Sequence, residues 1–179
     1  MSNSDNSPPT GIGAVLARIG HRFRQQAFVV TDMAEAKASM RRSFGCTKFL
    51  EFSTTEPWQL RGREVRCDLS VAFGRSGNVQ VELIQPLAGE GVHFELLANR
   101  GPGAHHIGFF VDDLDAEAEA AAAAGFPPIM STAIGTARFC YLDTIDALGL
   151  YLELIHDPDD MMTKMMPWWD DPVATTPQP

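Results

Sequence analysis

The sequence has little of what marks secreted, zinc-knuckle, membrane or nucleic-acid-binding proteins. It contains only three cysteines, Cys46, Cys67 and Cys140, and no CxxC pair, so neither a disulfide framework nor a zinc knuckle is expected. No apolar run approaches the about 18 residues of a membrane span, and the N-terminus shows no basic-then-apolar signal pattern. Positive charge is scarce: the formal net charge of -9 disfavours nucleic acid and anionic membranes as partners. These absences predict a soluble cytoplasmic protein with buried, reduced thiols.

What the sequence does contain suits a globular fold: 45% of its 179 residues are hydrophobic and 21% are charged. The clearest local unit is GPGAHHIGFFVDDLDAEAEAAAAAGFP, residues 101–127. Its apolar run at 106–111 is too short for a helix and predicts a strand. The two aspartates at 112–113 supply capping oxygens for an alanine-rich helix over 114–124, which Gly125 ends. The unit is therefore strand, acidic turn and helix.

An earlier stretch repeats this unit. A strand is expected over 24–30, followed by Thr31-Asp32 and a helix over 33–43 that Gly45 closes. Further along, VQVELI at 79–84 matches LYLELI at 150–155 position for position, with a glutamate at the same place. Additional strands are expected over 48–53, 64–73, 129–132 and 137–142. The first copy is about ten residues longer, and glycine and proline assign the extra length to a loop over 54–63.

The repeat predicts an α+β fold of two tandem βαβββ modules that form a curved mixed sheet around a concave site. The modules span 23–86 and 104–156, with a connector over 87–103 that holds one or two helical turns between 92 and 98. An N-terminal tail, 1–22, carries a short amphipathic helix over 12–19. A Met/Trp-rich tail, 157–179, is too apolar to be free and is expected to cover a cavity or an interface.

Strand parity identifies the polar side chains of the concave site. Glu82 and Glu153 lie mid-strand on equivalent faces, and a buried carboxylate is costly unless it is paired, hydrogen-bonded or bound to a cation. The repeat alignment places Gln25 over His106 on the first strands. Two carboxylates, one imidazole and one amide oxygen suit a divalent ion, whether Co, Ni, Mn, Zn or Mg. His21 keeps the parity of Gln25 four residues earlier and remains an alternative ligand.

The other histidines are not expected to be metal ligands. His105 is on the opposite strand face and is expected to support the site from behind or to lie at the surface. His93 and His156 are expected to be ordinary polar residues.

Two motifs resemble those of the vicinal oxygen chelate superfamily. One is HHIGFFVDDLD at the start of the second module, and the other is an apolar-x-apolar-Glu-Leu pattern near the end of each module. The superfamily includes glyoxalase I, methylmalonyl-CoA epimerase, extradiol dioxygenases and bleomycin-resistance proteins. The resemblance covers about residues 23–156. In that superfamily the metal ligands come from the first and last strands of each module, which implies the same four positions here: Gln25, Glu82, His106 and Glu153.

Two members of the superfamily are the most similar. Methylmalonyl-CoA epimerases are most similar in local sequence, through VELIQPL, the glycine-rich connector and HHIGFFVDDLD. The Gln/Glu/His/Glu ligand set, in contrast, resembles that of eukaryotic-type glyoxalase I. Both resemblances imply proton transfer next to a carbonyl through a metal-stabilised enediolate. Glu153 is the candidate base, and Glu82 is either a ligand only or the second acid/base. Epimerases also use an additional acidic residue from the middle strands of the first module; this residue cannot be placed from the sequence, because the stretch Arg61-Gly62-Arg63-Glu64 offers only Glu64.

The resulting prediction is a divalent-metal-dependent isomerase, epimerase or glyoxalase-type lyase. Its substrate would be a small carbonyl compound, either a thioester or an apolar molecule, and Arg41, Arg42 and Lys48 could meet an anionic cofactor such as CoA. The choice between CoA and glutathione stays open. Superfamily members commonly pair modules within a chain or across a dimer, so a homodimer is also expected.

Two other functions compete with this prediction. A metal-free protein that sequesters a hydrophobic small molecule is the alternative, although two inward carboxylates, Glu82 and Glu153, disfavour it. An extradiol-type dioxygenase is the third, and it would use two histidines and one glutamate for iron. Gln25 stands where the first of those histidines is expected.

Overall fold

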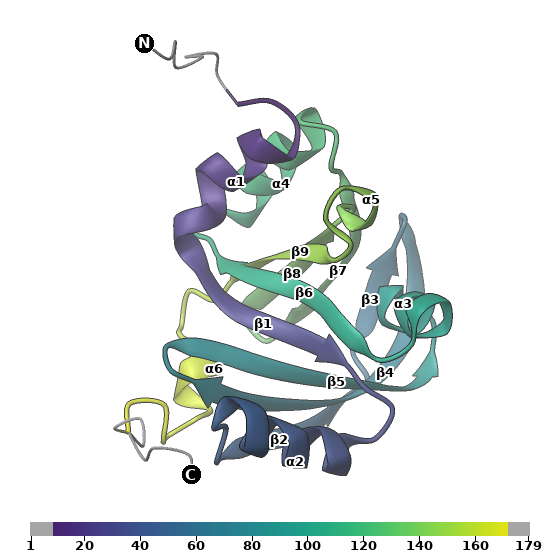
Figure 1. Cartoon of the computed structure of the whole chain (residues 1–179). Coiled ribbons are helices and arrows are strands. Elements are labelled where there is room, and N and C mark those ends of the chain that lie inside the picture. The colour runs from purple at the N-terminus through teal and green to yellow at the C-terminus, as the bar shows by residue number, and fades with distance from the viewer. Residues whose placement is uncertain (1–8, 172–179) are drawn as a thin grey trace, which may run out of the picture.

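The structure is a computed structural model that describes residues 9–171 (Figure 1). Its first half contains a strand, a helix and four further strands: β1 (Phe23–Val29), α2 (Met33–Phe44), β2 (Phe49–Thr54), β3 (Pro57–Leu60), β4 (Arg63–Ser76) and β5 (Val79–Gly89). Its second half has the same order with three further strands in place of four and with one short helix added: β6 (Gly103–Phe110), α4 (Leu114–Ala123), β7 (Pro128–Ile134), β8 (Ala137–Leu142), α5 (Ile145–Leu148) and β9 (Tyr151–His156).

Shorter helical elements flank and join the two halves. α1 (Ile12–Ile19) and the 3₁₀ turn η1 (Gly20–Arg22) precede them, α3 (Val92–Arg100) connects them, and α6 (Met161–Lys164) follows. The predicted amphipathic helix at 12–19 is confirmed, and α1 lies beside α4 (Figure 1). Among residues 9–171, no helix has the length and apolarity needed to cross a membrane.

The strands form one nine-stranded mixed sheet in the order β2-β4-β3-β7-β8-β9-β6-β1-β5, and β4 also pairs with β5. This second pairing of β4 closes the sheet on itself. Within each half the first and last strands run parallel, β1 with β5 and β6 with β9, and β1 pairs antiparallel with β6 to join the halves. The predicted α+β fold of two βαβββ modules is therefore confirmed, while the division into the ranges given above stays a prediction.

The two large helices begin at equivalent aspartates. Asp32 accepts a hydrogen bond from the backbone N–H of Glu35, and Asp113 accepts one from Ala116, both at 3.0 Å. α2 ends at Gly45, which has φ +67° as a left-handed cap. α4 ends one residue earlier than predicted, and Gly125 follows its cap with φ +96°.

Removing the Asp113 cap tests whether this aspartate stabilises the start of α4. Asp113→Ala is expected to lower the free energy of unfolding by about 1 kcal/mol, because the N–H of Ala116 loses its acceptor. Urea denaturation followed by circular dichroism measures the change. Glu119→Ala, at an exposed position of the same helix, is the control and should have little effect; equal losses in both variants would contradict the cap.

The prediction of a loop over 54–63 is wrong. Residues Pro57–Leu60 form β3, which makes a hairpin with β4 and pairs with β7 through Gln59 and Leu60. Trp58 and Leu60 are buried while Pro57 and Gln59 are exposed, which is the alternation of a strand. Proline and glycine in this stretch obscured that pattern: Pro57 begins the strand, and Gly62 at φ +80° makes the turn that follows it.

The core is divided among three clusters of buried side chains. One packs α1 and α4 against the outer face of β6, β8 and β9, and another packs α2 against β4 and β5. The third lies inside the curve of the sheet, where Trp58, Tyr141 and Met162 belong to it. The inner cluster surrounds the candidate site, so the outer clusters can hold the fold independently of the polar groups there.

Candidate metal and active site

The four predicted site residues lie on four neighbouring strands of the sheet. Glu82 is on β5, Gln25 on β1, His106 on β6 and Glu153 on β9, which are consecutive in the strand order. All four side chains point into the curve of the sheet, and their exposed fractions are between 0% and 8%. The structure thus brings together residues that are far apart in the chain.

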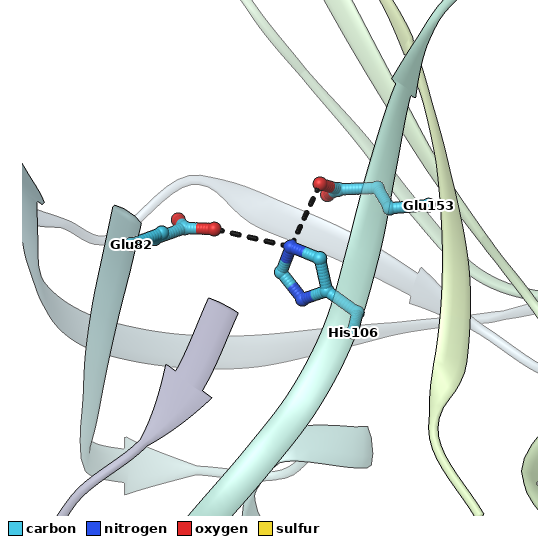
Figure 2. A group of neighbouring side chains, drawn as sticks. All are labelled: Glu82, His106 and Glu153. Carbon is cyan, nitrogen blue, oxygen red and sulfur yellow. Dashed lines mark ion pairs between the residues drawn. The ribbon is translucent and has the colours of Figure 1, made fainter. Parts of the chain in front are cut away.

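His106 stands at the centre of this group (Figure 2). Its Nε2 lies 3.2 Å from Glu82 Oε2, 3.1 Å from Glu153 Oε2 and 3.1 Å from Gln25 Oε1. One ligand atom from each of Glu82, His106 and Glu153 lies within 4.8 Å of the others. Gln25 is held in turn by its Nε2, which donates to Gln80 Oε1 at 2.7 Å.

The charge of the cluster favours a bound cation. Two carboxylates face one imidazole, so with both carboxylates ionised the group is negative even when His106 is protonated. Burial raises the pKa of Glu82, and His106 opposes that shift. Burial would lower the pKa of His106, but the attraction of Glu153 and Glu82 outweighs it and raises that pKa to about 9. The residues present therefore fit a divalent ion, which would supply the missing positive charge.

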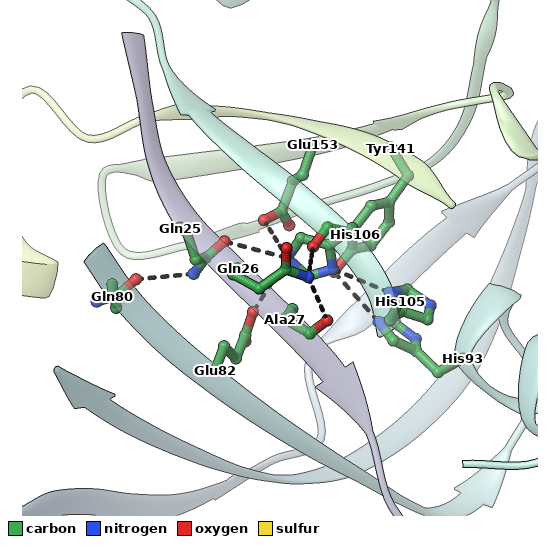
Figure 3. A network of polar contacts seen from close by, with 10 residues as sticks. All are labelled: Gln25, Gln26, Ala27, Gln80, Glu82, His93, His105, His106, Tyr141 and Glu153. Atoms are coloured by element: carbon green, nitrogen blue, oxygen red, sulfur yellow. Dashed lines mark hydrogen bonds and ion pairs between the residues drawn. The ribbon is translucent and has the colours of Figure 1, made fainter. Parts of the chain in front are cut away.

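His105 supports His106 from behind (Figure 3). Their Nδ1 atoms are 2.9 Å apart, and burial holds the pKa of His105 well below its usual range, so His105 is neutral. The hydrogen-bond network then assigns the donor: His106 Nδ1–H donates to His105 Nδ1, which directs His106 Nε2 toward the carboxylates. An imidazole oriented in this way through its other nitrogen is typical of metal-binding histidines. Of the two predictions for His105, support from behind matches its burial and a surface position does not.

His93 and Tyr141 belong to the same network and were missed by the sequence analysis. The His93 ring stacks on His105 at 4.5 Å between centroids, and its Nε2 lies 3.2 Å from the hydroxyl of Tyr141. Burial first, and then Glu153 and Glu82, raise the pKa of Tyr141 well above its usual value, which keeps the phenol protonated. The sequence could have indicated Tyr141 through strand pairing. Tyr141 stands opposite Glu153 in the β8–β9 ladder, so both side chains lie on one face of the sheet.

Other candidates lie away from the cluster. His21 is exposed in η1 and borders a surface depression with Arg22 and Asp112, so it does not take the place of Gln25. Glu64 is exposed in the β3–β4 hairpin, outside the site.

The three basic residues that were candidates to bind an anionic cofactor each contact another side chain at the surface. Arg41 lies over the Phe49 ring, Arg42 pairs with Glu35 at 3.0 Å, and Lys48 pairs with Asp171 at 2.6 Å.

Gly108 makes room for Gln25. It pairs with Gln25 across the β1–β6 ladder and with Glu153 across the β6–β9 ladder. A Cβ atom at this position would lie 2.5 Å from Gln25 Oε1 and 3.0 Å from Ile155 Cδ1. Any larger residue must therefore displace the amide oxygen from His106.

Gly108→Ala is expected to weaken metal binding by about 10- to 100-fold, because the added methyl moves Gln25 out of the ligand group. Competition against a chromogenic chelator, with cobalt as the metal, measures the affinity. Gly20→Ala is the matched control, since a Cβ there meets no atom within 4 Å. Unchanged affinity in a folded Gly108→Ala protein would show that Gln25 is not a ligand.

A cavity of about 270 Å³ opens beside the cluster. Gln25, Glu82 and Glu153 form its polar end, with His93 and Tyr141 near them. The remaining wall is apolar except for Thr54 and comes from β2, β3, β4, β5, β7, β8, α6 and the residue after α6. Its apolar residues are Phe52, Trp58, Leu69, Val71, Phe73, Ile84, Ile134, Phe139, Met161, Met162 and Met165. The cluster is thus accessible to a small molecule from one side.

The family model of the glyoxalase/bleomycin resistance protein/dioxygenase superfamily matches residues 24–141, more than half of the chain. The chain belongs to this superfamily. The matched range contains Gln25, Glu82 and His106, and Glu153 lies beyond it on β9. No curated protein matches the sequence significantly.

Several solved structures of this superfamily resemble the chain. Methylmalonyl-CoA epimerase from Mycobacterium tuberculosis is 22% identical, with a TM-score of 0.59 over 79% of this chain and 91% of that one. A methylmalonyl-CoA epimerase in complex with methylmalonyl-CoA and NH4+ is 21% identical, with a TM-score of 0.56 over 77% and 95%. A single-residue variant of the Streptomyces coelicolor epimerase in complex with 2-nitronate-propionyl-CoA is 22% identical, with a TM-score of 0.56 over 77% and 95%. At such identities the likeness establishes the shared fold.

Proposed function

We propose that this superfamily member is a divalent-metal-dependent enzyme that transfers a proton on the carbon next to a carbonyl, as an isomerase, an epimerase or a glyoxalase-type lyase. The observation that carries the proposal is the meeting of two buried carboxylates, one imidazole and one amide oxygen at the polar end of a cavity. The epimerase activity of the similar solved structures supports the isomerase class.

The proposed roles follow from the positions of the side chains. Gln25, Glu82, His106 and Glu153 would hold the metal, and the metal would supply Lewis-acid polarisation of the substrate carbonyl. Both carboxylates line the cavity from opposite sides of His106: in the proposal Glu153 accepts the proton from the carbon, and Glu82 is the second acid/base. The apolar wall excludes water, which strengthens the electrostatic interactions in the site.

The middle strands of the first module carry no further acid into the cavity. From β2 and β4 the described lining residues are Phe52, Thr54, Leu69, Val71 and Phe73. Glu64, the acid considered from the sequence for this role, is exposed. In our proposal Glu82 and Glu153 therefore divide the acid and base roles between them.

A metal-free function as a hydrophobic binding protein is the second candidate. Two observations favour it: the cavity wall is largely apolar, and a protonated His106 can pair with both carboxylates without a metal. Metal content distinguishes the two candidates directly. The homodimer and the cytoplasmic location predicted from the sequence remain proposals.

Exchange of the α-proton for deuterium tests the enzyme proposal. The protein is loaded in turn with Co, Ni, Mn, Zn or Mg and incubated in deuterated water with neutral ketones, hydroxyketones and acyl thioesters. Proton NMR should show loss of the α-proton signal of at least one compound, and a chelator should stop the exchange. Absence of exchange from every compound with every metal would contradict the proposal.

A further inference from the structure

Gln25 differs from the other three proposed ligands, because the two ends of its amide differ in chemistry but hardly in shape. Only the oxygen can bind a cation, since the amide nitrogen carries two hydrogens and acts as a donor. A rotation of the amide by about 180° would therefore turn a ligand into a group that repels the ion. The role proposed for Gln25 thus depends on the contacts that fix its amide.

Gln80 fixes the direction of the Gln25 amide (Figure 3). Gln25 Nε2 donates to Gln80 Oε1 at 2.7 Å, and Gln25 Oε1 lies 3.1 Å from His106 Nε2. Gln25 and Gln80 are partners in the parallel β1–β5 ladder, and both are buried, so solvent does not compete for this contact. The hydrogen-bond network therefore assigns the nitrogen of Gln25 to Gln80 and leaves its oxygen for the cluster.

Gln80 is oriented in turn by a residue of the C-terminal segment. Its Nε2 donates to the sulfur of Met166 at 3.9 Å, which directs its oxygen toward Gln25. Met166 is buried and belongs to the inner core cluster. A thioether is a weak acceptor, yet a buried amide N–H without any acceptor is costly, so this contact still favours one orientation of Gln80.

The segment that carries Met166 is fastened on both sides of it. We call residues 157–171 the C-terminal strap. At its start, Asp157 accepts hydrogen bonds from the first two N–H groups of α6 at 2.9 and 2.8 Å. At its end, the guanidinium of Arg75 donates to the Asp171 carbonyl at 3.0 Å. These contacts hold the Met166 sulfur against Gln80.

We propose that Gln80 and Met166 are positioning residues for the metal site. Met166 orients Gln80, and Gln80 turns the oxygen of Gln25 toward the other ligands; we call this chain of three side chains the amide relay. Neither Gln80 nor Met166 lines the cavity, so both act through Gln25 alone. The C-terminal strap thereby sets the orientation of a ligand on β1. This inference rests on the metal dependence in the proposed function.

Two substitutions interrupt the amide relay. Gln80→Met removes the acceptor oxygen and nearly keeps the length of the side chain, so cobalt affinity, measured by chelator competition, should fall about 10- to 100-fold. Met166→Leu removes the sulfur and should cause a smaller loss of about 3- to 10-fold, because the broken contact is weaker. Met33→Leu is the matched control: it makes the same change at a buried methionine of the outer cluster under α2 and should leave the affinity unchanged.

The double variant distinguishes the amide relay from a loss of packing. If Met166 acts through Gln80, Met166→Leu adds no further loss of affinity in the Gln80→Met protein. The visible spectrum of cobalt bound to either single variant should also approach that of cobalt-loaded Gln25→Leu, in which the amide ligand is absent. Additive losses of affinity, or a cobalt spectrum equal to that of the unchanged protein, would contradict the proposal.

NMR of the metal-free protein tests the geometry of the amide relay itself. Nuclear Overhauser effects should connect the side-chain amide protons of Gln80 with the methyl group of Met166, and those of Gln25 with the Gln80 side chain. If the folded protein shows neither connection, the amide relay is wrong whatever the metal content.

The outcomes separate this inference from the proposed function. If both single variants bind cobalt as tightly as the unchanged protein, the amide relay is wrong and the enzyme proposal stands. If the affinities fall as expected but the loaded, unchanged protein exchanges no α-proton, the amide relay stands and the enzyme proposal fails. If the unchanged protein binds none of the five metals, both fail.

Discussion

Replacing Glu153 with glutamine is expected to reduce metal-dependent α-proton exchange by about 100- to 10 000-fold. The amide keeps the shape of the side chain and an oxygen that can still contact a metal, but it accepts no proton at neutral pH. Because Glu153 faces the cavity and is 3% exposed, no solvent buffer can readily take its place. The rate is measured by NMR in deuterated water on protein with a determined metal content.

Two further variants make this result specific. Glu82→Gln changes the other carboxylate of the same cluster, the second acid/base of our proposal, and it should lower exchange less than Glu153→Gln does, because Glu153 is the group that removes the α-proton. Glu51→Gln, on β2 at an exposed position, should leave the rate unchanged. Full exchange in a metal-loaded Glu153→Gln protein would show that Glu153 is not the base.

Replacing His106 with alanine is expected to weaken metal binding by at least about 100-fold, because it removes the one nitrogen that contacts Glu82, Gln25 and Glu153 together. The fold should persist, since the outer core clusters under α2, α1 and α4 do not include the site. The free energy of unfolding will still fall, because two buried carboxylates lose a partner.

A matched histidine variant controls for this loss of stability. His156 lies at the end of β9, and its Nδ1 contacts the Val111 carbonyl at 3.2 Å, away from the cluster. His156→Ala should keep the metal affinity of the unchanged protein. Far-ultraviolet circular dichroism confirms folding of both variants, and chelator competition compares their affinities; equal affinities would remove His106 from the site.

The internal repeat explains how much of the fold could be predicted. Asp32 and Asp113 mark equivalent helix starts, and VQVELI and LYLELI give equivalent last strands, so the modules and their parallel pairings follow from local patterns. The same alignment led to the four polar residues that the structure brings together. The metal and the catalytic roles assigned to them remain proposals.

What the sequence did not reveal depends on contacts outside the repeat. β3 pairs with β7 of the other module, and only that long-range pairing and the burial of Trp58 show why a stretch with proline and glycine is a strand. His93 reaches the site from α3, in the connector, where no strand parity applies. The apolar tail was expected to cover a cavity or an interface, and the structure places Met161 and Met162 on the cavity.

The measurement that most directly tests the account is the metal content of untagged protein, purified without chelators, by inductively coupled plasma mass spectrometry. We expect about one divalent ion per chain, retained through gel filtration and lost in His106→Ala. No bound metal, together with no retention of added Co, Ni, Mn or Zn, would contradict it and leave a protein that binds hydrophobic molecules without a metal.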